Sequence, residues 1–542
     1  MPTISFSKED LIRLSGASES DLEILPLIGI QVESVEGDEM TVEIEANRAD
    51  MFSVEGIARY LRGFIGKELG FKEYGVSEGD FTVTVDKSVE AVRPYIGAAH
   101  ISGVKMDDYL IRTIMDLQEK LHATIGRKRK KLAIGVHDSS KIGRDIIYKA
   151  VPPEEIRFVP LAKDEEMSMR EILEKHEKGR EYRHLLERME RWPILMDSEG
   201  NVLSFPPIIN GQLTAVNEDT TDIFIDMTGT DLNLIKKAMA IFCSAMAERG
   251  GRIESALLKY PDFEIRMPDM GGEMVSASLE YINSLLGTEI SGEKAVELLK
   301  KARFSASFNG DILEVLVPPY RMDILHQADI AEEIAIAYGY DRFVPELPKE
   351  VTFGRRLASH GLKKAIKESL IGLGFNEVLT LTLTSDDQQF RKMRIEKGSA
   401  VEIKNPITEF HTSVRSWLIP SLMDILAKNR HRDLPQRIFE IGIVADSEGR
   451  NREKVGALLM DDKASFTGIK SIVSALLRDL GLDFSVEETL HPSFIDGRCA
   501  SVLVEGNEVG FFGEIHPEVL ENFDLEHPVS AFEIDISDLK IK

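Results

Sequence analysis

The chain has 542 residues, of which 43% are hydrophobic and 29% charged, and its 66 Lys and Arg against 92 Asp and Glu give a net charge of -26. This length exceeds what one hydrophobic core usually organises, so we expect three or four domains. The charge repels phosphate backbones over most of the surface, so any nucleic-acid contact has to be local. Two cysteines, Cys243 and Cys499, are too few for a thiolate zinc cluster or a disulfide framework, which fits a reducing compartment.

The sequence shows no targeting or membrane-spanning segment. The stretch from Met1 to Asp10 includes acidic residues and no apolar core, and nowhere do about 18 apolar residues follow one another. We therefore expect a cytoplasmic protein that makes no contact with a membrane.

Helical patterns appear twice in the first half of the chain. Apolar residues recur at helical spacing from Val54 to Ile65, directly after Ser53, which is a suitable N-cap. The charged stretch of residues 163–191 contains a capping box, Ser168 with Glu171, and a break at Gly179. We expect an amphipathic helix at the first place and two short exposed helices at the second.

Two apolar strands, near residues 205–211 and 224–231, end in polar residues. Such ends are where sheets commonly place binding groups. An ordinary turn explains each of these residues as well as a binding pocket does. The polar side chains concerned are Asn210, Gln212, Thr214, Asp226, Thr228 and Thr230.

Two further features of this region admit a functional and a structural interpretation. His137 and Asp138 follow an apolar strand, but no serine or cysteine nucleophile motif accompanies them, so we interpret His137 as structural. The basic run of residues 127–131 could contact RNA or form a solvated turn, and composition alone favours the turn.

Beyond residue 264 the pattern changes to helices around residues 279–286 and 293–301, a hairpin turning at Asn309-Gly310, and a helix from Ile324. The Asn-Gly pair suits a two-residue turn that needs positive φ at both central positions. This order resembles a winged-helix or helix-turn-helix module, although it does not by itself imply DNA binding.

The last unit begins with a helix whose apolar stripe ends at Gly374. Leu379, Leu381 and Leu383 then alternate with threonines, which predicts a strand with one buried face. Further helices and strands follow to the C-terminus. We expect a mixed α/β domain around a mainly antiparallel sheet, and an α+β multidomain chain as a whole.

Four carboxylates lie close together in the sequence: Asp323, Asp329, Glu332 and Glu333. On a helix the last three share one face, and converging carboxylate oxygens suit Mg²⁺. The alternative is that acidic residues in a first helical turn merely complement the helix dipole. Spacing alone favours that alternative.

At this point the sequence resembles a known family. Residues 318–340, 405–422 and 513–520 are similar to the phenylalanyl-tRNA synthetase beta subunit. Asn47-Arg48-Ala49-Asp50, Ile134 to Asp138 and Pro206 to Asn210 resemble its archaeal and eukaryotic branch. The likeness is colinear over nearly the whole chain. It implies an N-terminal domain of residues 1–88, a tRNA-editing domain of residues 89–265, a winged-helix-like domain of residues 266–348 and a degenerate class II synthetase-like domain of residues 349–542.

The resemblance also implies partners and site residues. A separate alpha chain would bind ATP, phenylalanine and the acceptor end of tRNA(Phe), usually in an alpha2-beta2 tetramer. The four carboxylates match the family's magnesium positions one by one. The six polar residues fall in the editing region, where tyrosine wrongly attached to tRNA(Phe) is hydrolysed, and Asp226 is the best candidate for orienting substrate or water.

Several features depart from this pattern. The last domain lacks the ATP-binding residues of class II motifs two and three, there is no Walker loop, and no room exists for the tRNA-binding domains of the bacterial branch. One alternative is a paralogue that only binds RNA or a partner, with an inactive editing pocket. A second, a winged-helix nucleic-acid regulator, predicts a basic recognition helix, whereas residues 324–338 are acidic and apolar.

Overall fold

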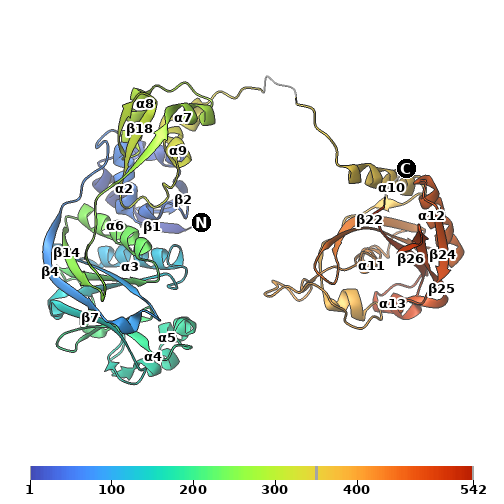
Figure 1. Ribbon diagram of the computed structural model, residues 1–542, viewed down its shortest axis with the longest axis horizontal. Helices are drawn as coiled ribbons and strands as arrows, with labels where there is room; N and C mark the ends of the chain where they lie inside the picture. The colour runs from blue at the N-terminus through green and yellow to red at the C-terminus, as the bar shows by residue number, and fades with distance from the viewer. Residues whose placement is uncertain (1, 348–351, 540–542) are drawn as a thin grey trace. The chain divides into compact units, whose positions relative to one another are not determined.

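The computed structural model describes residues 2–347 and 352–539. Two compact units divide the chain, one of residues 1–346 and one of residues 347–542 (Figure 1). Each unit combines sheets with helices, so the expected mixed α/β, multidomain class is confirmed. No helix among the described residues is long and apolar enough to span a bilayer.

A small antiparallel sheet begins the first unit. Its strand order is β1-β3-β2, with β1 (Thr3–Ser7), β2 (Gln31–Glu36) and β3 (Glu39–Glu43). The helices of this part are α1 (Lys8–Ser15) and α2 (Val54–Phe64). The prediction of α2 is confirmed, and the Ser53 hydroxyl accepts a hydrogen bond from the Gly56 N–H as its N-cap.

A ten-stranded sheet follows, in the order β12-β11-β10-β7-β4-β14-β5-β13-β6, with β15 paired to β14. Its strands are β4 (Val76–Val85), β5 (Tyr95–Ser102), β6 (Leu132–Asp138), β7 (Asp145–Val151), β10 (Trp192–Asp197), β11 (Val202–Phe205), β12 (Ile209–Asn210), β13 (Ile223–Gly229), β14 (Arg252–Lys259) and β15 (Glu264–Met267). Its two long helices are α3 (Asp108–Ala123) and α6 (Leu232–Glu248). Strand β4 pairs in parallel with β14 and β7, so a strand from within the expected first domain of residues 1–88 belongs to this sheet.

Helix α6 covers one face of this sheet and leaves polar side chains on the other. Gly97 on β5 pairs with Met227 on β13, and a Cβ at position 97 would lie 2.6 Å from Ile235 of α6. Met227 therefore faces α6. Because side chains alternate along a strand, Asp226 and Thr228 point to the opposite face.

The charged stretch folds into two short helices, as predicted, next to the short pair β8 (Arg157–Phe158) and β9 (Met167–Ser168). The helices are α4 (Met169–Lys175) and α5 (Glu177–Tyr182), and Ser168 and Glu171 form the predicted capping box. The break lies at His176, not at Gly179. Gly179 is inside α5, where a Cβ would lie 1.8 Å from the Ile172 carbonyl oxygen, so a glycine lets the two helices touch.

The third part of the first unit contains a three-stranded sheet and three helices. The elements are β16 (Glu273–Ser278), α7 (Leu279–Leu286), α8 (Gly292–Lys301), β17 (Ser305–Asn309), β18 (Ile312–Val317) and α9 (Gln327–Tyr338). Asn309 pairs with Ile312, so the hairpin turn consists of Gly310 and Asp311, one residue later than predicted. Helix α9 begins three residues after the expected start, because His326 and Asp329 form its capping box.

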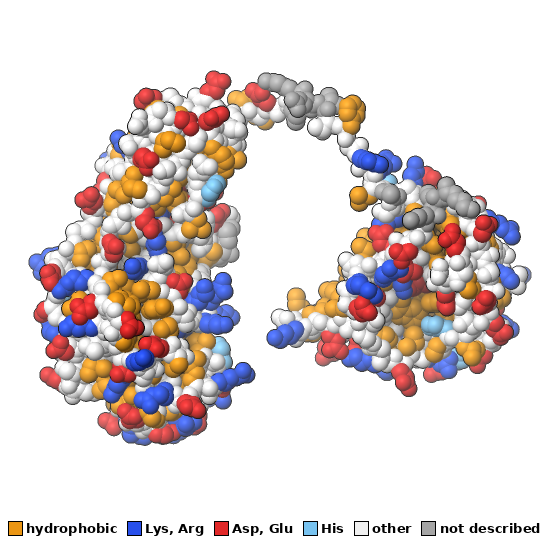
Figure 2. Space-filling view, in the orientation of Figure 1, with side chains coloured by type: hydrophobic (Ala, Val, Ile, Leu, Met, Phe, Trp, Pro, Cys, Tyr) orange, Lys and Arg blue, Asp and Glu red, His pale blue; other side chains and the backbone are white. Residues whose placement is uncertain are grey.

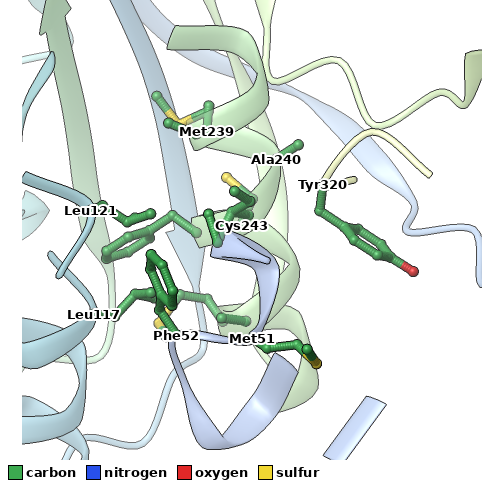
Figure 3. Close-up of a cluster of buried hydrophobic side chains, with 14 of the residues drawn as sticks. Met51, Phe52, Leu117, Leu121, Met239, Ala240, Cys243 and Tyr320 are labelled. Atoms are coloured by element: carbon green, nitrogen blue, oxygen red, sulfur yellow. The ribbon is translucent and has the colours of Figure 1, made fainter. Parts of the chain in front are cut away.

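The N-terminal part, the ten-stranded sheet and the part with α7, α8 and α9 share a hydrophobic core, and a smaller core lies around α4 and α5. Figure 3 shows Met51 and Phe52 from the N-terminal part beside Leu117 of α3 and Cys243 of α6. All four side chains are at most 1% exposed. The small N-terminal sheet and the ten-stranded sheet are therefore packed as one body.

The second unit contains a seven-stranded sheet in the order β19-β22-β23-β27-β26-β25-β24, antiparallel except for β19 with β22. Its strands are β19 (Asn376–Glu377), β22 (Gln436–Ala445), β23 (Asn451–Met460), β24 (Phe484–Glu488), β25 (Phe494–Val504), β26 (Asn507–Ile515) and β27 (Val529–Asp535). The helices are α10 (Ala358–Gly372), α11 (Ile419–Lys428), α12 (Phe466–Asp479) and α13 (Pro517–Asn522). Side chains of α10 and α12 pack on one face with Phe439, and those of α11 pack on the other with Ile438.

The predicted strand of residues 379–384 is wrong in most of its length and in the face it buries. Only the last two of these residues form a strand, β20 (Leu383–Thr384), which pairs with β21 (Ser413–Val414). Leu379 and Leu381 are 86% and 67% exposed, whereas the Thr380 hydroxyl turns inward and donates to Glu440 Oε2 at 2.6 Å. Thr382 is exposed as well, so the leucines face outward and burial does not alternate regularly along the segment.

Candidate active site

A cavity of about 320 Å³ lies between α3, strands β6 and β13, and the segment of residues 204–210. Its walls are mainly apolar, and a few polar side chains converge on it, which is the usual composition of a ligand pocket. The apolar walls include Ile111, Met115, Ile134, Val136, Phe205, Pro206, Pro207 and Ile208. The polar lining includes Glu119, Arg129, Ser204, Asn210, Asp226 and Thr228.

The Asp226 carboxylate enters the cavity over a glycine. Asp226 on β13 pairs with Gly135 on β6, and a Cβ at position 135 would lie 1.9 Å from Asp226 Oδ2. Only a residue without a side chain leaves this space open. The carboxylate is 2% exposed and still lines the cavity, so a ligand there would meet a largely desolvated acceptor.

His137 supports this carboxylate from behind. Its Nε2 lies 3.0 Å from Asp226 Oδ2 and its Nδ1 lies 2.8 Å from the Thr214 hydroxyl. The imidazole is fully buried. With Nε2–H donating to Asp226, Nδ1 accepts from Thr214, and a continuous chain of hydrogen bonds fixes the aspartate rotamer. In the sequence, the support of Asp226 by His137 is indicated only by the alternation of side chains along β6, which places position 137 on the same face as position 135.

The structure brings together four of the six predicted polar residues. Asn210, Asp226 and Thr228 line the cavity, and Thr214 reaches it through His137. Gln212 and Thr230 are exposed and do not line the cavity. Gln212 Oε1 accepts from the Ala162 N–H at 2.8 Å, and Thr230 lies beyond the end of β13.

Three further side chains line the cavity near α3: Arg129 from the basic run, and Glu119 and His122, which the sequence did not single out. Arg129 donates through Nη2 to Glu119 Oε1 at 2.5 Å and through Nη1 to the Ile208 carbonyl at 2.9 Å. His122 accepts from the Ile134 N–H at 2.7 Å, so its other nitrogen donates to Glu119. The hydrogen bond from His122, together with Arg129, lowers the pKa of Glu119 to about 2. The sequence feature that could have identified this wall is the i, i+3 spacing of Glu119 and His122 just before the basic run.

The basic run forms a tight loop beside this wall. Arg127, Lys128 and Arg129 all have positive φ, at 47°, 53° and 64°. Non-glycine residues rarely adopt this conformation, and it clusters at functional sites. Arg129 folds inward over Tyr182, with its guanidinium 4.5 Å from the ring centre, while Arg127, Lys128 and Lys130 are exposed.

The four carboxylates expected to bind magnesium lie on and before α9, with arginines between them. Arg321 donates to both oxygens of Asp323 and to Glu333 Oε1, at 2.6–2.9 Å. Asp329 caps the helix by accepting from the backbone N–H groups of residues 325 and 326. Glu332 is exposed. Among the described residues no group of three or more His, Cys, Asp or Glu side chains is arranged to hold a metal ion.

Excess negative charge nevertheless remains around Glu332. Burial raises its pKa, and so do the neighbouring carboxylates of Glu333, Glu45, Asp329 and Asp323. Arg321 thus neutralises part of this cluster and leaves Glu332 facing like charges. A cation would relieve that repulsion.

Family models and relatives agree along the whole chain. Residues 72–253 match the B3/4 domain, residues 275–340 the tRNA synthetase B5 domain, and residues 345–536 the phenylalanyl tRNA synthetase beta chain CLM domain. The phenylalanine–tRNA ligase beta subunit of Archaeoglobus fulgidus is 45% identical over 99% of this chain and 98% of its own length. That of Methanothrix thermoacetophila is 44% identical over 99% of this chain and 100% of its own.

A solved structure is also similar. It is a crystal structure of an N-terminal fragment of the phenylalanyl-tRNA synthetase beta subunit from Pyrococcus horikoshii, with a TM-score of 0.60 and 39% identity, covering 62% of this chain and 99% of the fragment. Together with the full-length relatives, this shows that the chain belongs to the family of phenylalanine–tRNA ligase beta subunits.

Proposed function

We propose that this chain is the non-synthetic subunit of a heteromeric phenylalanine–tRNA ligase and hydrolyses tyrosine wrongly attached to tRNA(Phe). The observation that carries the proposal is the apolar cavity with the buried Asp226 carboxylate, which lies in the region matching the B3/4 domain. An alpha chain would bind ATP and attach phenylalanine. The likeness of the full-length relatives to this chain supports that division of labour.

The chemistry of the cavity suits the discrimination of tyrosine from phenylalanine by the phenol hydroxyl group. An apolar synthetic pocket rejects an analogue that merely adds a hydroxyl by only about a hundredfold, so a second, hydrolytic site is useful. Tyrosine in this cavity can satisfy the polar atoms of Asp226 and Thr228 with its phenol. Phenylalanine leaves them unpaired, which costs about 1–3 kcal/mol per group. Correctly charged tRNA is therefore spared.

A water molecule is the best candidate for the nucleophile. Ser204 lines the cavity, but its hydroxyl has no hydrogen-bond partner among the described residues, so no base activates it. The water oxygen attacks the ester carbonyl, the bond from that carbon to the ribose oxygen breaks, and the proton passes to the ribose oxygen. Asn210 and the tRNA's own terminal hydroxyl would orient the water and the ester, while Asp226 orients the substrate by binding its phenol.

The basic loop is the proposed contact for the acceptor strand of tRNA(Phe). Arg127, Lys128 and Lys130 are exposed beside the cavity wall formed by Arg129. On a chain with net charge -26, such a cluster is a local attraction for phosphates on an otherwise repelling surface.

The second unit has the features of a scaffold. Helices cover both faces of its sheet, with α11 contributing Leu422 and Leu426 to a core that fills one of them. We interpret this unit as a degenerate class II synthetase domain, because it lacks the ATP-binding residues of class II motifs two and three. We interpret the part containing α7, α8 and α9 as winged-helix-like. The purified chain alone should show no phenylalanine-dependent pyrophosphate exchange.

Exposed apolar side chains of the second unit are the proposed contact for the alpha chain. Leu379, Leu381, Ile407 and Phe410 are 67–99% exposed. Figure 2 shows hydrophobic side chains gathered on the surface of this unit. Large exposed apolar patches mark interaction sites. An alpha2-beta2 tetramer is the assembly we expect.

Magnesium is the proposed cofactor of the acidic cluster on α9. Asp323, Asp329, Glu332 and Glu333 would supply oxygen ligands, which is the donor chemistry that Mg²⁺ prefers. The remaining negative charge around Glu332 supports the fit, and Arg321 limits how much of Asp323 and Glu333 is available. A bound Mg²⁺ would neutralise the cluster and stabilise assembly with the alpha chain.

The direct test uses the enzyme reconstituted with its alpha chain and Tyr-tRNA(Phe) as substrate. Asp226→Ala should slow the release of tyrosine by at least about tenfold, or about 1.4 kcal/mol of barrier, while phenylalanine charging persists. Gln212→Ala and Thr230→Ala serve as controls outside the cavity and should change nothing. If the unmodified enzyme releases no tyrosine, the chain is a binding paralogue with an inactive pocket. If release survives both Asp226→Ala and Asn210→Ala, the cavity is not the editing site.

A further inference from the structure

Arg93 is a buried cation behind the cavity. It lies just before β5, its side chain is 4% exposed, and no carboxylate of the described residues forms an ion pair with it. Burial lowers its pKa to about 10, so it keeps its charge at neutral pH. The nearby Asp226 carboxylate offsets only part of the cost of burying this charge, so the hydrogen bonds of Arg93 have a compensating role.

The guanidinium donates two hydrogen bonds to Thr228 at the end of β13. Its Nε donates to the Thr228 hydroxyl oxygen at 2.9 Å, and its Nη2 donates to the Thr228 carbonyl at 2.6 Å. Its Nη1 donates to the Lys130 carbonyl in the basic loop at 3.2 Å. One side chain therefore connects a residue of the cavity with the loop beside it.

These contacts determine the direction of the Thr228 hydroxyl hydrogen. Arginine can only donate hydrogen bonds, so Thr228 Oγ1 has to accept from Arg93. The hydroxyl hydrogen must then point elsewhere, and no described residue accepts it. Thr228 is fully buried from solvent and lines the cavity. A ligand in the cavity is the acceptor that remains.

We propose that Arg93 is a positioning residue that fixes Thr228 as a hydrogen-bond donor to the tyrosine phenol, while Asp226 accepts the phenol hydrogen. The inference rests on the proposed editing function. A phenol both donates and accepts, so a donor and an acceptor two residues apart on one strand face match it, whereas a phenylalanine ring matches neither. Arg93 thereby contributes to the choice of substrate without touching it.

The test is a double-mutant cycle on the reconstituted enzyme, with Tyr-tRNA(Phe) and Phe-tRNA(Phe) as the two substrates. Thr228→Val removes the hydroxyl at nearly constant volume. Arg93→Lys keeps the charge but replaces the fork of donors by a single ammonium group. Each change should lower the ratio of tyrosyl to phenylalanyl deacylation by about tenfold, the loss of about one hydrogen bond. In the Thr228→Val background, Arg93→Lys should have no further effect on that ratio.

Arg191→Lys is the matched control, since Arg191 donates to the Ala150 carbonyl away from the cavity. A thermal unfolding midpoint for each variant separates folding from selectivity. The inference is overturned if Arg93→Lys slows both substrates equally, if its effect persists in the Thr228→Val background, or if Thr228→Val leaves the ratio unchanged while Asp226→Ala still abolishes editing. If neither Asp226→Ala nor Thr228→Val affects tyrosine release, the proposed editing site itself fails.

Discussion

Asp226 and Gly135 face each other across strands β13 and β6, and the carboxylate of Asp226 fills the space that a side chain at position 135 would need. The position of Asp226, the catalytic candidate, therefore depends on the absence of a side chain at residue 135. His137, two positions along β6, adds a hydrogen bond to the same carboxylate from behind. One strand therefore supplies both the space for Asp226 and its support.

This relationship predicts the effect of Gly135→Ala. A Cβ at position 135 would also lie 2.7 Å from His137 Nε2, so the new methyl group must displace the carboxylate or the imidazole. We expect tyrosine release from Tyr-tRNA(Phe) to fall by at least about tenfold, with a loss of about 1–3 kcal/mol in the free energy of unfolding from overpacking. Deacylation kinetics and urea unfolding measure the two effects.

Gly143→Ala is the control for that change. A Cβ at position 143 would make ordinary contacts with Asp197, at 3.6 Å or more. Editing by this variant should equal that of the unmodified enzyme. Normal editing by Gly135→Ala would show that the position of Asp226 is unimportant and would contradict the assigned pocket.

The basic loop gives a prediction about salt. Replacing Lys128 and Lys130 by Gln should raise the KM for Tyr-tRNA(Phe) and leave kcat nearly unchanged, because these exposed side chains contact phosphates and not the ester. Each lost phosphate contact should reduce the slope of log affinity against log salt by about 0.7–0.9. Lys141→Gln, another exposed lysine of the same sheet domain, is the control. An unchanged slope in the double variant would exclude the loop as a tRNA contact.

Sequence periodicity located most elements but not the surfaces they present. Helices α2 and α7 and the capping box of α4 follow from local patterns alone. The leucines at positions 379 and 381 show where this reasoning stops. Their alternation with threonines predicts a buried leucine face, but a pattern cannot tell a face that packs inside the chain from one that stays exposed.

The active-site candidates likewise divide into residues that a local sequence pattern indicates and residues that only the folded structure identifies. Asp226 and Thr228 stand at the end of an apolar strand, a signal visible in the sequence. Gly135 and Arg93 acquire their roles only through contacts with β13 from segments about 90 and 135 residues away, as the register and the hydrogen bonds show. Long-range pairing of this kind leaves no local pattern, so it becomes visible only in the folded chain.

Acid should weaken the first unit through Glu248. Burial raises the pKa of this side chain, but Arg62 and the Tyr74 hydroxyl outweigh burial and lower it to about 2. A carboxylate with a lowered pKa stabilises the fold above its unfolded pKa of about 4.5, and the contribution is lost as the pH falls toward 2. The full contribution is on the order of 3 kcal/mol.

Glu248→Gln should therefore lower the thermal midpoint of the first unit at pH 7 and flatten its dependence on pH between about 5 and 2. Differential scanning calorimetry across this range measures both. Glu90→Gln, a change at an exposed side chain of the same unit, should leave the pH dependence unaltered. A Glu248→Gln midpoint that declines in acid as steeply as that of the unmodified chain would refute the assignment.

The acidic cluster on α9 gives the last prediction, because its two adjacent glutamates have different surroundings. Glu333 is 3% exposed and accepts from Arg321 at 2.6 Å and from the Tyr60 hydroxyl at 3.2 Å. Glu333→Gln removes a buried counter-charge and should destabilise the first unit by about 1–3 kcal/mol, with or without metal. Glu332 is exposed, so Glu332→Gln should leave the unfolding midpoint unchanged or raise it slightly as like-charge repulsion falls.

The proposed magnesium site is therefore tested by Glu332→Gln and not by changes at Glu333. If Mg²⁺ binds this cluster, Glu332→Gln should raise the Mg²⁺ concentration needed for half-maximal assembly with the alpha chain by about tenfold, a loss of about 1.4 kcal/mol of binding free energy. Sedimentation velocity at graded Mg²⁺ measures assembly, and Glu280→Gln, an exposed change on α7, is the control. Assembly of Glu332→Gln that depends on Mg²⁺ as in the unmodified complex would mean that the carboxylates serve only to pair Arg321 and cap α9.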